Sequence, residues 1–262
     1  MSGSMLPTVT VEGVNFHAVT EQDAVSHIMN SLASGRGGTV VTPNVDILRQ
    51  MRAGINRDIA AACDLVLADG MPVVWASRLK RSPLPERVTG ASLAWELAAA
   101  AERAGLSVFV LGGAADVPGR AAAQLVRSLP GRVVAGHHSP PMDFTTSHAD
   151  YQEVEDAVVL SKPDIVLVGL GFPKQELLSL QLRTAWPGAW YVGCGAAVDF
   201  MAGDVPRAPA VLQRLGLEWT YRLVKEPRRL ARRYLQHGLP YAAAMLVRSA
   251  VAGLASAHVQ RR

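Results

Sequence analysis

Short apolar runs alternate with Ala- and Leu-rich stretches from about residue 9 to residue 217, and this alternation limits the fold more than any other feature of the chain. The runs VFVLGG (108–113) and DIVLVGLG (164–171) are apolar without a polar–apolar alternation. Such runs are typical of parallel strands that are covered on both faces. Repeated strand–helix units with right-handed crossovers predict an α/β fold with a Rossmann-like, doubly wound, mostly parallel sheet.

The boundaries of the predicted elements follow from these runs. Strands are predicted at Thr39–Pro43, Leu65–Asp69, Val108–Gly112, Arg132–Ala135, Ile165–Gly169 and Trp190–Gly193. Helices are predicted between them at Val45–Ala62, Ala91–Ala104, Gly119–Leu129, Asp150–Leu160 and Lys174–Ala185. A hairpin over Val9–Phe16 is expected before the sheet, and the segment GHHSPPMDFTTSHAD (136–150) is expected to form a loop.

The composition indicates a reduced chain with one sizeable core and an appendage. Its 262 residues, 49% of them hydrophobic, suffice for that burial. Cys63 and Cys194 are far apart and belong to no CxxC motif, which predicts reduced thiols and a cytosolic location. The start of the chain lacks the order of a signal peptide. Because Leu239–Ser256 contains Pro240 and Arg248, no uncharged apolar run reaches the roughly 18 residues of a spanning helix.

The net charge of +4 conceals an asymmetry between two parts of the chain. Residues 222–262 hold nine Lys and Arg against one acid, whereas the preceding 221 residues hold 17 basic and 21 acidic residues. We therefore predict a mildly acidic core at 9–217 and a basic helical appendage at 218–262. A basic segment of this kind seeks phosphate in nucleic acid, anionic lipid or a charged substrate.

Basic residues of the appendage recur at intervals of three, four and three, which places them on one helical face: Arg222, Lys225, Arg229 and Arg232. Pro227 must start a new helix or kink the existing one. A solvated polar face is the alternative interpretation. The density of cations, the scarcity of acids and the nearby indole of Trp219 favour a helix that lies on a membrane surface.

Polar side chains follow the predicted strands, at the edge where an open α/β sheet binds its ligands. Asp69 ends an apolar strand and precedes Gly-Met-Pro. A carboxylate at this position can act as a general base toward a hydroxyl group, and a helix N-cap is the structural alternative. His137 and His138 are rival bases, but a loop rich in Ser and Pro is a poor scaffold for accurate geometry.

Four more side chains are predicted to bind substrate at this edge. Thr42 and Asn44 flank a proline and are suited to hydrogen-bonding hydroxyl groups, with strand-to-helix capping as the alternative. Gln175 follows a proline in the first turn of a predicted helix, where polar ligands are attracted. Arg87 has the fork geometry that binds phosphate, and its alternative is a salt bridge to Glu86 or another acid.

The glycines after the strands complete the predicted substrate-binding set. Gly112 and Gly113 open a predicted helix, where backbone N–H groups and the helix dipole would meet a pyrophosphate. A tight turn is an equal alternative, because the spacing lacks GxGxxG and no Walker GK[ST] occurs. Gly171 and Asp199 follow later strands. No DxD pair or metal-ligand spacing occurs, so we expect neither metal nor cofactor and assign stabilisation of a leaving diphosphate to arginines.

Five segments in this order resemble the WecG/TagA/CpsF glycosyltransferase family: TPN at 42–44, ADGMP at 68–72, ERVTG at 86–90, GFPKQE at 171–176, and GLEW with YRL at 216–223. The similarity covers about Val9–Leu235. The Ala-rich segment after Tyr241 is not matched to the family pattern, and its role stays open. The resemblance implies an inverting transfer from a UDP-sugar to an undecaprenyl-diphosphate-linked sugar.

The resemblance also implies partners and residue roles. The implied donor is most often UDP-N-acetylmannosamine and the acceptor lipid-linked N-acetylglucosamine, in teichoic acid or surface-polysaccharide synthesis. Asp69 would be the base, while Thr42, Asn44, Arg87 and Gln175 would line the donor and sugar site. The basic helices would dock on the inner face of the cytoplasmic membrane and bring Arg222, Arg229 or Arg232 to the diphosphate. The family's core tends to self-associate, so a homo-oligomer is expected.

Three alternatives remain open at this point. Within the family, the donor could be UDP-glucose or an N-acetylmannosaminuronic acid nucleotide. A nicotinamide-dependent oxidoreductase could use the same fold, although the fingerprint glycines and a ribose-binding acid are not convincingly spaced. A nucleic-acid-binding protein would use the basic appendage, but it leaves the polar residues at the strand ends unexplained, so no nucleic-acid partner is expected.

Overall fold

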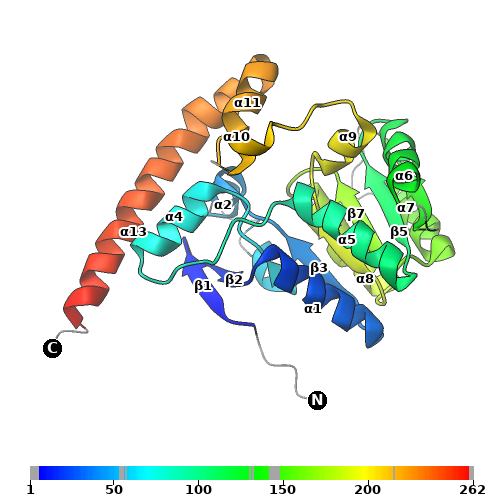
Figure 1. The fold of residues 1–262 in the computed structure, drawn as a ribbon, viewed down its shortest axis with the longest axis horizontal. Helices are drawn as coiled ribbons and strands as arrows, with labels where there is room; N and C mark the ends of the chain where they lie inside the picture. The colour runs from blue at the N-terminus through cyan, green and yellow to red at the C-terminus, as the bar shows by residue number, and fades with distance from the viewer. Residues whose placement is uncertain are drawn as a thin grey trace.

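A six-stranded parallel sheet forms the centre of the molecule (Figure 1). The structure is a computed structural model that describes residues 6–52, 56, 58–129, 131, 133–141, 148–214 and 216–259, with the backbone alone at 148–149, 210, 214, 229 and 258–259. The strand order is β4-β3-β8-β7-β5-β6, and each neighbouring pair is parallel. The strands are β3 (Gly38–Val41), β4 (Leu65–Val66), β5 (Val108–Gly112), β6 (Val134–His138), β7 (Ile165–Gly169) and β8 (Trp190–Gly193). A separate antiparallel hairpin, β1 (Thr8–Val11) and β2 (Val14–His17), precedes them.

Helices cover both faces of the sheet, which makes the fold doubly wound as predicted. The helices before the C-terminal group are α1 (Glu21–Ala33), α2 (Val45–Arg52), α3 (Ile59–Ala62), α4 (Met71–Leu79), α5 (Gly90–Ala104), α6 (Val117–Ser128), α7 (His148–Ser161), α8 (Lys174–Ala185), α9 (Ala197–Ala202) and α10 (Ala210–Arg214). Alternate residues of β5 belong to different clusters: Val108 and Val110 pack with α1, α5, α6 and α9, whereas Phe109 and Leu111 pack with α7 and α8. Burial on both sides explains the unbroken apolar runs in the sequence.

Most predicted elements are confirmed, and the differences have local causes. The predicted helix at 45–62 is instead two helices, α2 and α3. Strand β6 starts two residues later than predicted and extends to His138, so the two histidines end a strand and do not lie in a loop. Helix α1 was not predicted, although Thr20 and Asp23 form a capping box at its start. Strand β4 ends at Val66, three residues before the predicted end at Asp69, and helix α4, which was not predicted, begins at Met71.

The C-terminal helices cross the carboxyl end of the sheet and then run back along the core (Figure 1). They are α11 (Glu218–Lys225), α12 (Pro227–Ala231), a π-helical turn η1 (Arg232–Gly238) and α13 (Leu239–Val259). Of the two outcomes predicted for Pro227, a new helix and a kink, the structure has a new helix that begins there. Helix α13 packs against α4, with Met245 fully buried in the core, and Arg248 forms an ion pair with Glu12 of the N-terminal hairpin at 2.8 Å.

Among the described residues, one helical segment, Arg232–Ala257, is long and apolar enough to cross a membrane, with a mean hydropathy of 1.3 over its best window. The sequence analysis had expected no such segment. Only 28% of that window is buried in the molecule, and α13 contacts the core through Ala242, Met245 and Ser249.

Candidate active site

The carboxyl ends of the parallel strands bring the predicted site residues to one edge of the sheet. Asp69 follows β4, and its backbone N–H donates to the Pro43 carbonyl at 3.2 Å, which holds it beside the segment that follows β3. The hydroxyl of Thr42 donates to the Gly193 carbonyl at the end of β8, at 3.3 Å. These bonds join the ends of β3, β4 and β8, where a parallel α/β sheet binds its ligands.

Asp69 is partly buried, and its carboxylate does not cap a helix. Helix α4 begins at Met71 with Gly70 as its N-cap residue, and no side chain caps it. The N-cap alternative for Asp69 is therefore not what the structure shows. The carboxyl group is therefore not used as a cap, which leaves the role of a general base open to it.

Four charged side chains act on the carboxyl group of Asp69: Arg87, Glu218, Arg222 and Arg207. Burial raises the pKa of Asp69 to about 6, with Arg87 opposing this shift and Glu218 adding to it. Arg87 donates to the Gln213 carbonyl at 2.9 Å and pairs with Glu218 at 3.5 Å, not with its sequence neighbour Glu86. The alternative role predicted for Arg87, a salt bridge to an acid, is therefore present, and the acid belongs to a C-terminal helix.

Arg222 reaches the site from α11. Its guanidinium stacks 5.6 Å from the centroid of the Phe200 ring, and its Nε is buried without a hydrogen-bond partner among the described residues. The basic residues predicted on one face are separated in the structure, because the chain breaks at Glu226 before α12. Arg232 is exposed, and the side chain of Arg229 lies outside the described residues. Their roles in catalysis stay predictions.

Asn44 and Gln175 both make bonds within the protein. The Asn44 side-chain oxygen accepts from the backbone N–H groups of Asp46 and Ile47 at 3.0 and 3.1 Å, so Asn44 caps α2, as the structural alternative predicted. Gln175 is only 3% exposed, and its oxygen accepts from Gly171 and Gly195, each at 3.1 Å. Gln175 therefore ties the loops after β7 and β8 together.

Glu176 was not predicted as a site residue. It follows Gln175 in the chain, and its side chain is buried, with 2% exposed. Its Oε1 accepts from the Gln175 amide at 2.7 Å, while Oε2 has no hydrogen-bond partner in the described part of the chain. Burial raises the pKa of Glu176 to about 7. The bond to Glu176 fixes the Gln175 amide so that its oxygen faces the two loops.

Gly112 and Gly113 form a tight turn at the end of β5. Their φ values of 104° and 88° are incompatible with a right-handed helix. Helix α6 accordingly begins at Val117, and the prediction that these glycines open it was wrong. A Cβ on Gly112 would lie 2.7 Å from the Gly169 carbonyl oxygen, so the glycine also permits close packing of β5 and β7.

The remaining candidates lie in different places. Asp199 lies in α9 at the same edge, partly buried. His137 and His138 end β6, whereas Asp69 follows β4, and these are the opposite outer strands of the sheet.

Cys63 and Cys194 are unbridged, as predicted. Within the described residues, no group of three or more His, Cys, Asp or Glu side chains is placed to hold a metal ion.

The sequence analysis missed two charged residues of the site. Arg207 lies in the segment between α9 and α10, and Glu218 begins α11. Both Arg207 and Arg87 come shortly after a proline in the sequence. A proline near an arginine is too common a pattern to identify a site residue. Both residues reach Asp69 only because the chain after α9 folds back across the strand ends.

Comparisons with known proteins identify the family of this chain. The model of the glycosyl transferase WecG/TagA/CpsF family matches residues 9–253. The match extends beyond Tyr241 into α13, a segment that the sequence analysis could not align with the family. The chain is also 34% identical over 210 residues to an N-acetylglucosaminyldiphosphoundecaprenol N-acetyl-beta-D-mannosaminyltransferase of Bacillus spizizenii, and the alignment covers 79% of each protein. The chain belongs to the WecG/TagA/CpsF glycosyltransferase family.

Proposed function

We propose that this protein transfers a sugar, N-acetylmannosamine in the leading version, from a UDP-sugar to N-acetylglucosamine linked through a diphosphate to undecaprenol. The observation that supports this function best is the partly buried carboxyl group of Asp69 at the end of β4, surrounded by three arginines and one acid. The relative from Bacillus spizizenii is named for the corresponding N-acetylmannosaminyl transfer. Proteins of the same family with UDP-glucose or an N-acetylmannosaminuronic acid donor are the alternatives for the donor.

In the proposed reaction, Asp69 takes the proton from an acceptor hydroxyl group. The oxygen attacks the anomeric carbon, the bond from that carbon to the β-phosphate oxygen breaks, and UDP leaves with the bonding electrons. A single displacement inverts the anomeric configuration. A base with a pKa near 6 is largely ionised at neutral pH, so Asp69 is ready to accept a proton.

Guanidinium groups stabilise the departing diphosphate in this proposal, without a metal or cofactor. Arg222 supports this role best, because its buried Nε has no hydrogen-bond partner in the described chain and is available to a ligand. Fixed cations in a site that excludes water stabilise developing negative charge more strongly than they would in water.

We further propose that the enzyme is peripheral on the inner face of the cytoplasmic membrane. Lys225, Arg228 and Arg232 are exposed on the C-terminal helices. Helix α13 also exposes Val247, Val251 and Leu254 along one side, at helical spacing. Cations and exposed apolar side chains on the same group of C-terminal helices are the residue types that bind the surface of an anionic bilayer.

The function is tested by product analysis. The purified protein is incubated with UDP-N-acetylmannosamine, UDP-glucose, UDP-N-acetylglucosamine and UDP-N-acetylmannosaminuronic acid, each with a short-chain diphosphate-linked N-acetylglucosamine acceptor. The proposal expects one N-acetylhexosamine to be added, by mass, from the first donor. Binding of NAD in place of UDP, with no glycosylated product, would support the oxidoreductase alternative.

A further inference from the structure

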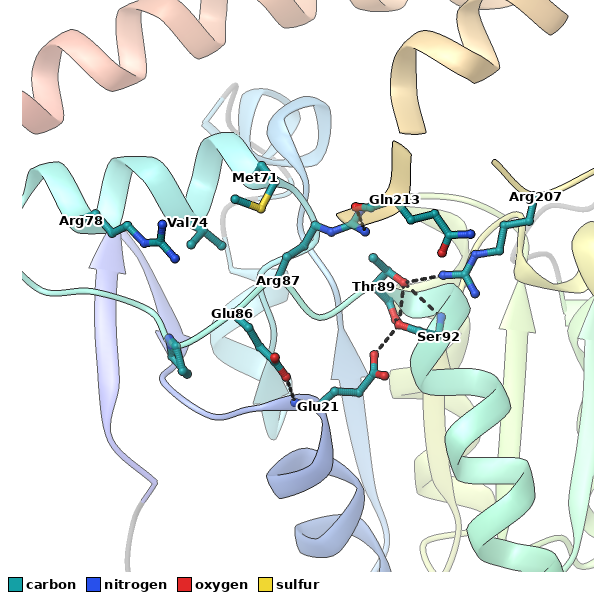
Figure 2. A pocket seen from close by; sticks show the side chains of 11 residues that line it. Glu21, Met71, Val74, Arg78, Glu86, Arg87, Thr89, Ser92, Arg207 and Gln213 are labelled. Carbon is teal, nitrogen blue, oxygen red and sulfur yellow. Dashed lines mark hydrogen bonds between the residues drawn. The ribbon is translucent and has the colours of Figure 1, made fainter. Parts of the chain in front are cut away.

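A pocket of about 390 Å³ lies between α4 and the start of α5, with Arg87 and Arg207 in its lining (Figure 2). This volume lies within the range of small-molecule sites, about 300 to 1,000 Å³. Its walls come from the starts of α1 and α5, one side of α4, the segment before α5, and α10 with the segment before it. Arg87 and Arg207 line the pocket and also act electrostatically on Asp69, so the pocket and the catalytic carboxyl group share two cations.

The pocket has two chemically different sides. Arg87 lies between Arg78 and Arg207 in Figure 2, and these are the cations of the lining. Glu21 and Glu86 lie together, and the backbone N–H of Glu21 donates to Glu86 at 2.6 Å. Guanidinium groups bind phosphate, whereas carboxylates and hydroxyls such as those of Thr89 and Ser92 bind the hydroxyl groups of a sugar.

Arg207 has hydrogen-bonding capacity left for a ligand. Its Nη2 is 3.5 Å from the Thr89 hydroxyl, at the limit of a hydrogen bond, and its buried Nε has no hydrogen-bond partner within the described residues. A buried N–H without a partner costs free energy unless a bound group satisfies it. An anionic ligand in the pocket would supply that acceptor.

An exposed apolar strip leads away from the cationic side. Trp75, Arg78 and Leu79 are exposed on α4 at spacings of three and four residues, which places them on one helical face. Helix α4 packs against α13, which exposes Val247 and Val251. A molecule with a diphosphate at Arg78 could therefore lay a hydrocarbon chain along Trp75 and Leu79.

The glycine turns lie elsewhere on the same edge. Gly112, Gly171 and Gly195 follow β5, β7 and β8, whereas α4 follows the outer strand β4. A nucleotide over the glycine turns and a second substrate in this pocket would approach Asp69 from different sides. A single displacement needs the acceptor hydroxyl and the departing UDP on opposite faces of the anomeric carbon, and two separate substrate sites allow this.

We propose that this pocket is the acceptor site, with Arg78 on the diphosphate and the side of Thr89 and Arg207, which acts on Asp69, on the acceptor sugar. The inference rests on the proposed function and adds the residues that select a diphosphate-linked lipid. Arg78 is a specificity residue here and takes no part in the chemical step.

The test measures binding separately from turnover. Farnesyl diphosphate is titrated calorimetrically into UDP-saturated wild type, Arg78→Met and Arg127→Met, an exposed arginine in the last turn of α6 that serves as the matched control. Loss of a charge-assisted contact should weaken binding about tenfold or more in Arg78→Met and leave the control unchanged. Equal affinity in all three proteins, or displacement of farnesyl diphosphate by UDP, would overturn the proposal.

Kinetics give a second readout that a general structural role would not reproduce. In Arg78→Met the KM for the diphosphate-linked acceptor should rise about tenfold while the KM for the UDP-sugar stays unchanged. Wild type should also prefer a diphosphate-linked over a monophosphate-linked acceptor, and Arg78→Met should lose most of that preference. A parallel rise in both KM values contradicts the assignment. Absence of transfer by wild type contradicts the proposed function, while the titration still decides whether the pocket binds a lipid diphosphate.

Discussion

At the scale of single residues, the ionisation of Asp69 is set by opposing effects. Burial and the neighbouring carboxylate of Glu218 raise its pKa, while Arg87, Arg222 and Arg207 lower it, and the balance is about 6. A base works only when it is deprotonated. We therefore expect kcat/KM for sugar transfer to fall about tenfold per pH unit below pH 6 and to level off above pH 7.

A pH–rate profile between pH 4.5 and 8 measures this. Glu218→Gln should move the acid limb to lower pH, because it removes a negative charge near Asp69 and frees Arg87 from its partner. A profile that is flat from pH 5 to 7, or an unmoved limb in Glu218→Gln, would show that another group limits the reaction.

Glu176 gives a prediction about stability. Its pKa is raised from 4.5 to about 7 in the folded protein, so the native state binds this proton more tightly than the unfolded state does. Stability should fall between pH 4.5 and 7 by on the order of 2 to 3 kcal/mol from this group, and not change further above pH 7. Glu176→Gln should be more stable than wild type at pH 8.

Urea unfolding at pH 5 and pH 8 checks this prediction. Glu153→Gln, which alters an exposed acid on α7, is the control and should keep the wild-type pH dependence. If Glu176→Gln is instead less stable than wild type at pH 8, Glu176 is ionised and stabilising in the native state.

At the scale of elements, the sequence predicted what local patterns encode. Strands β5, β7 and β8 and helix α8 have the predicted bounds, because apolar runs and flanking turn residues determine them. Asp69 was identified because it ends an apolar run that predicts a strand, although β4 itself ends at Val66. The approach of Arg207 and Glu218 depends on how a distant segment folds back over the sheet, which no local spacing encodes.

Sequence spacing could not distinguish a polar residue that binds substrate from one that caps a helix or holds a loop. Asn44 and Gln175 were both predicted to bind substrate, and both make hydrogen bonds that hold backbone groups. A side chain that caps a helix and one that binds a ligand follow a strand at the same positions. The basic stripe was likewise predicted as one face, but the break at Glu226 separates its residues.

The prediction about membrane binding concerns the exposed cations of helices α11 and α12. Lys225 and Arg228 are exposed, and each cation near an anionic surface contributes about 1 kcal/mol to binding. The double variant Lys225→Gln/Arg228→Gln should bind phosphatidylglycerol vesicles about tenfold or more weakly in flotation. Arg36→Gln/Arg127→Gln, which removes the same charge from exposed sites on the core, should bind as wild type does. An equal loss in both variants would indicate that only net charge matters.

At the scale of the whole molecule, the fold brings three parts together at Asp69. The parallel sheet supplies the glycine turns, α4 with α5 and α10 encloses the pocket, and the C-terminal helices add Glu218 and Arg222. Helix α13 is anchored through Met245 and the Arg248–Glu12 ion pair, so the chain after η1 belongs to the core as much as to an appendage. For this reason point variants test the account better than truncation.

The most direct measurement is single-turnover transfer from the UDP-sugar to the diphosphate-linked acceptor by Asp69→Asn and wild type. Removal of a general base should slow the chemical step by on the order of 10² to 10⁴, while UDP affinity and the unfolding temperature stay close to those of wild type. Transfer by a folded, UDP-binding Asp69→Asn at a rate near that of wild type would contradict the central claim.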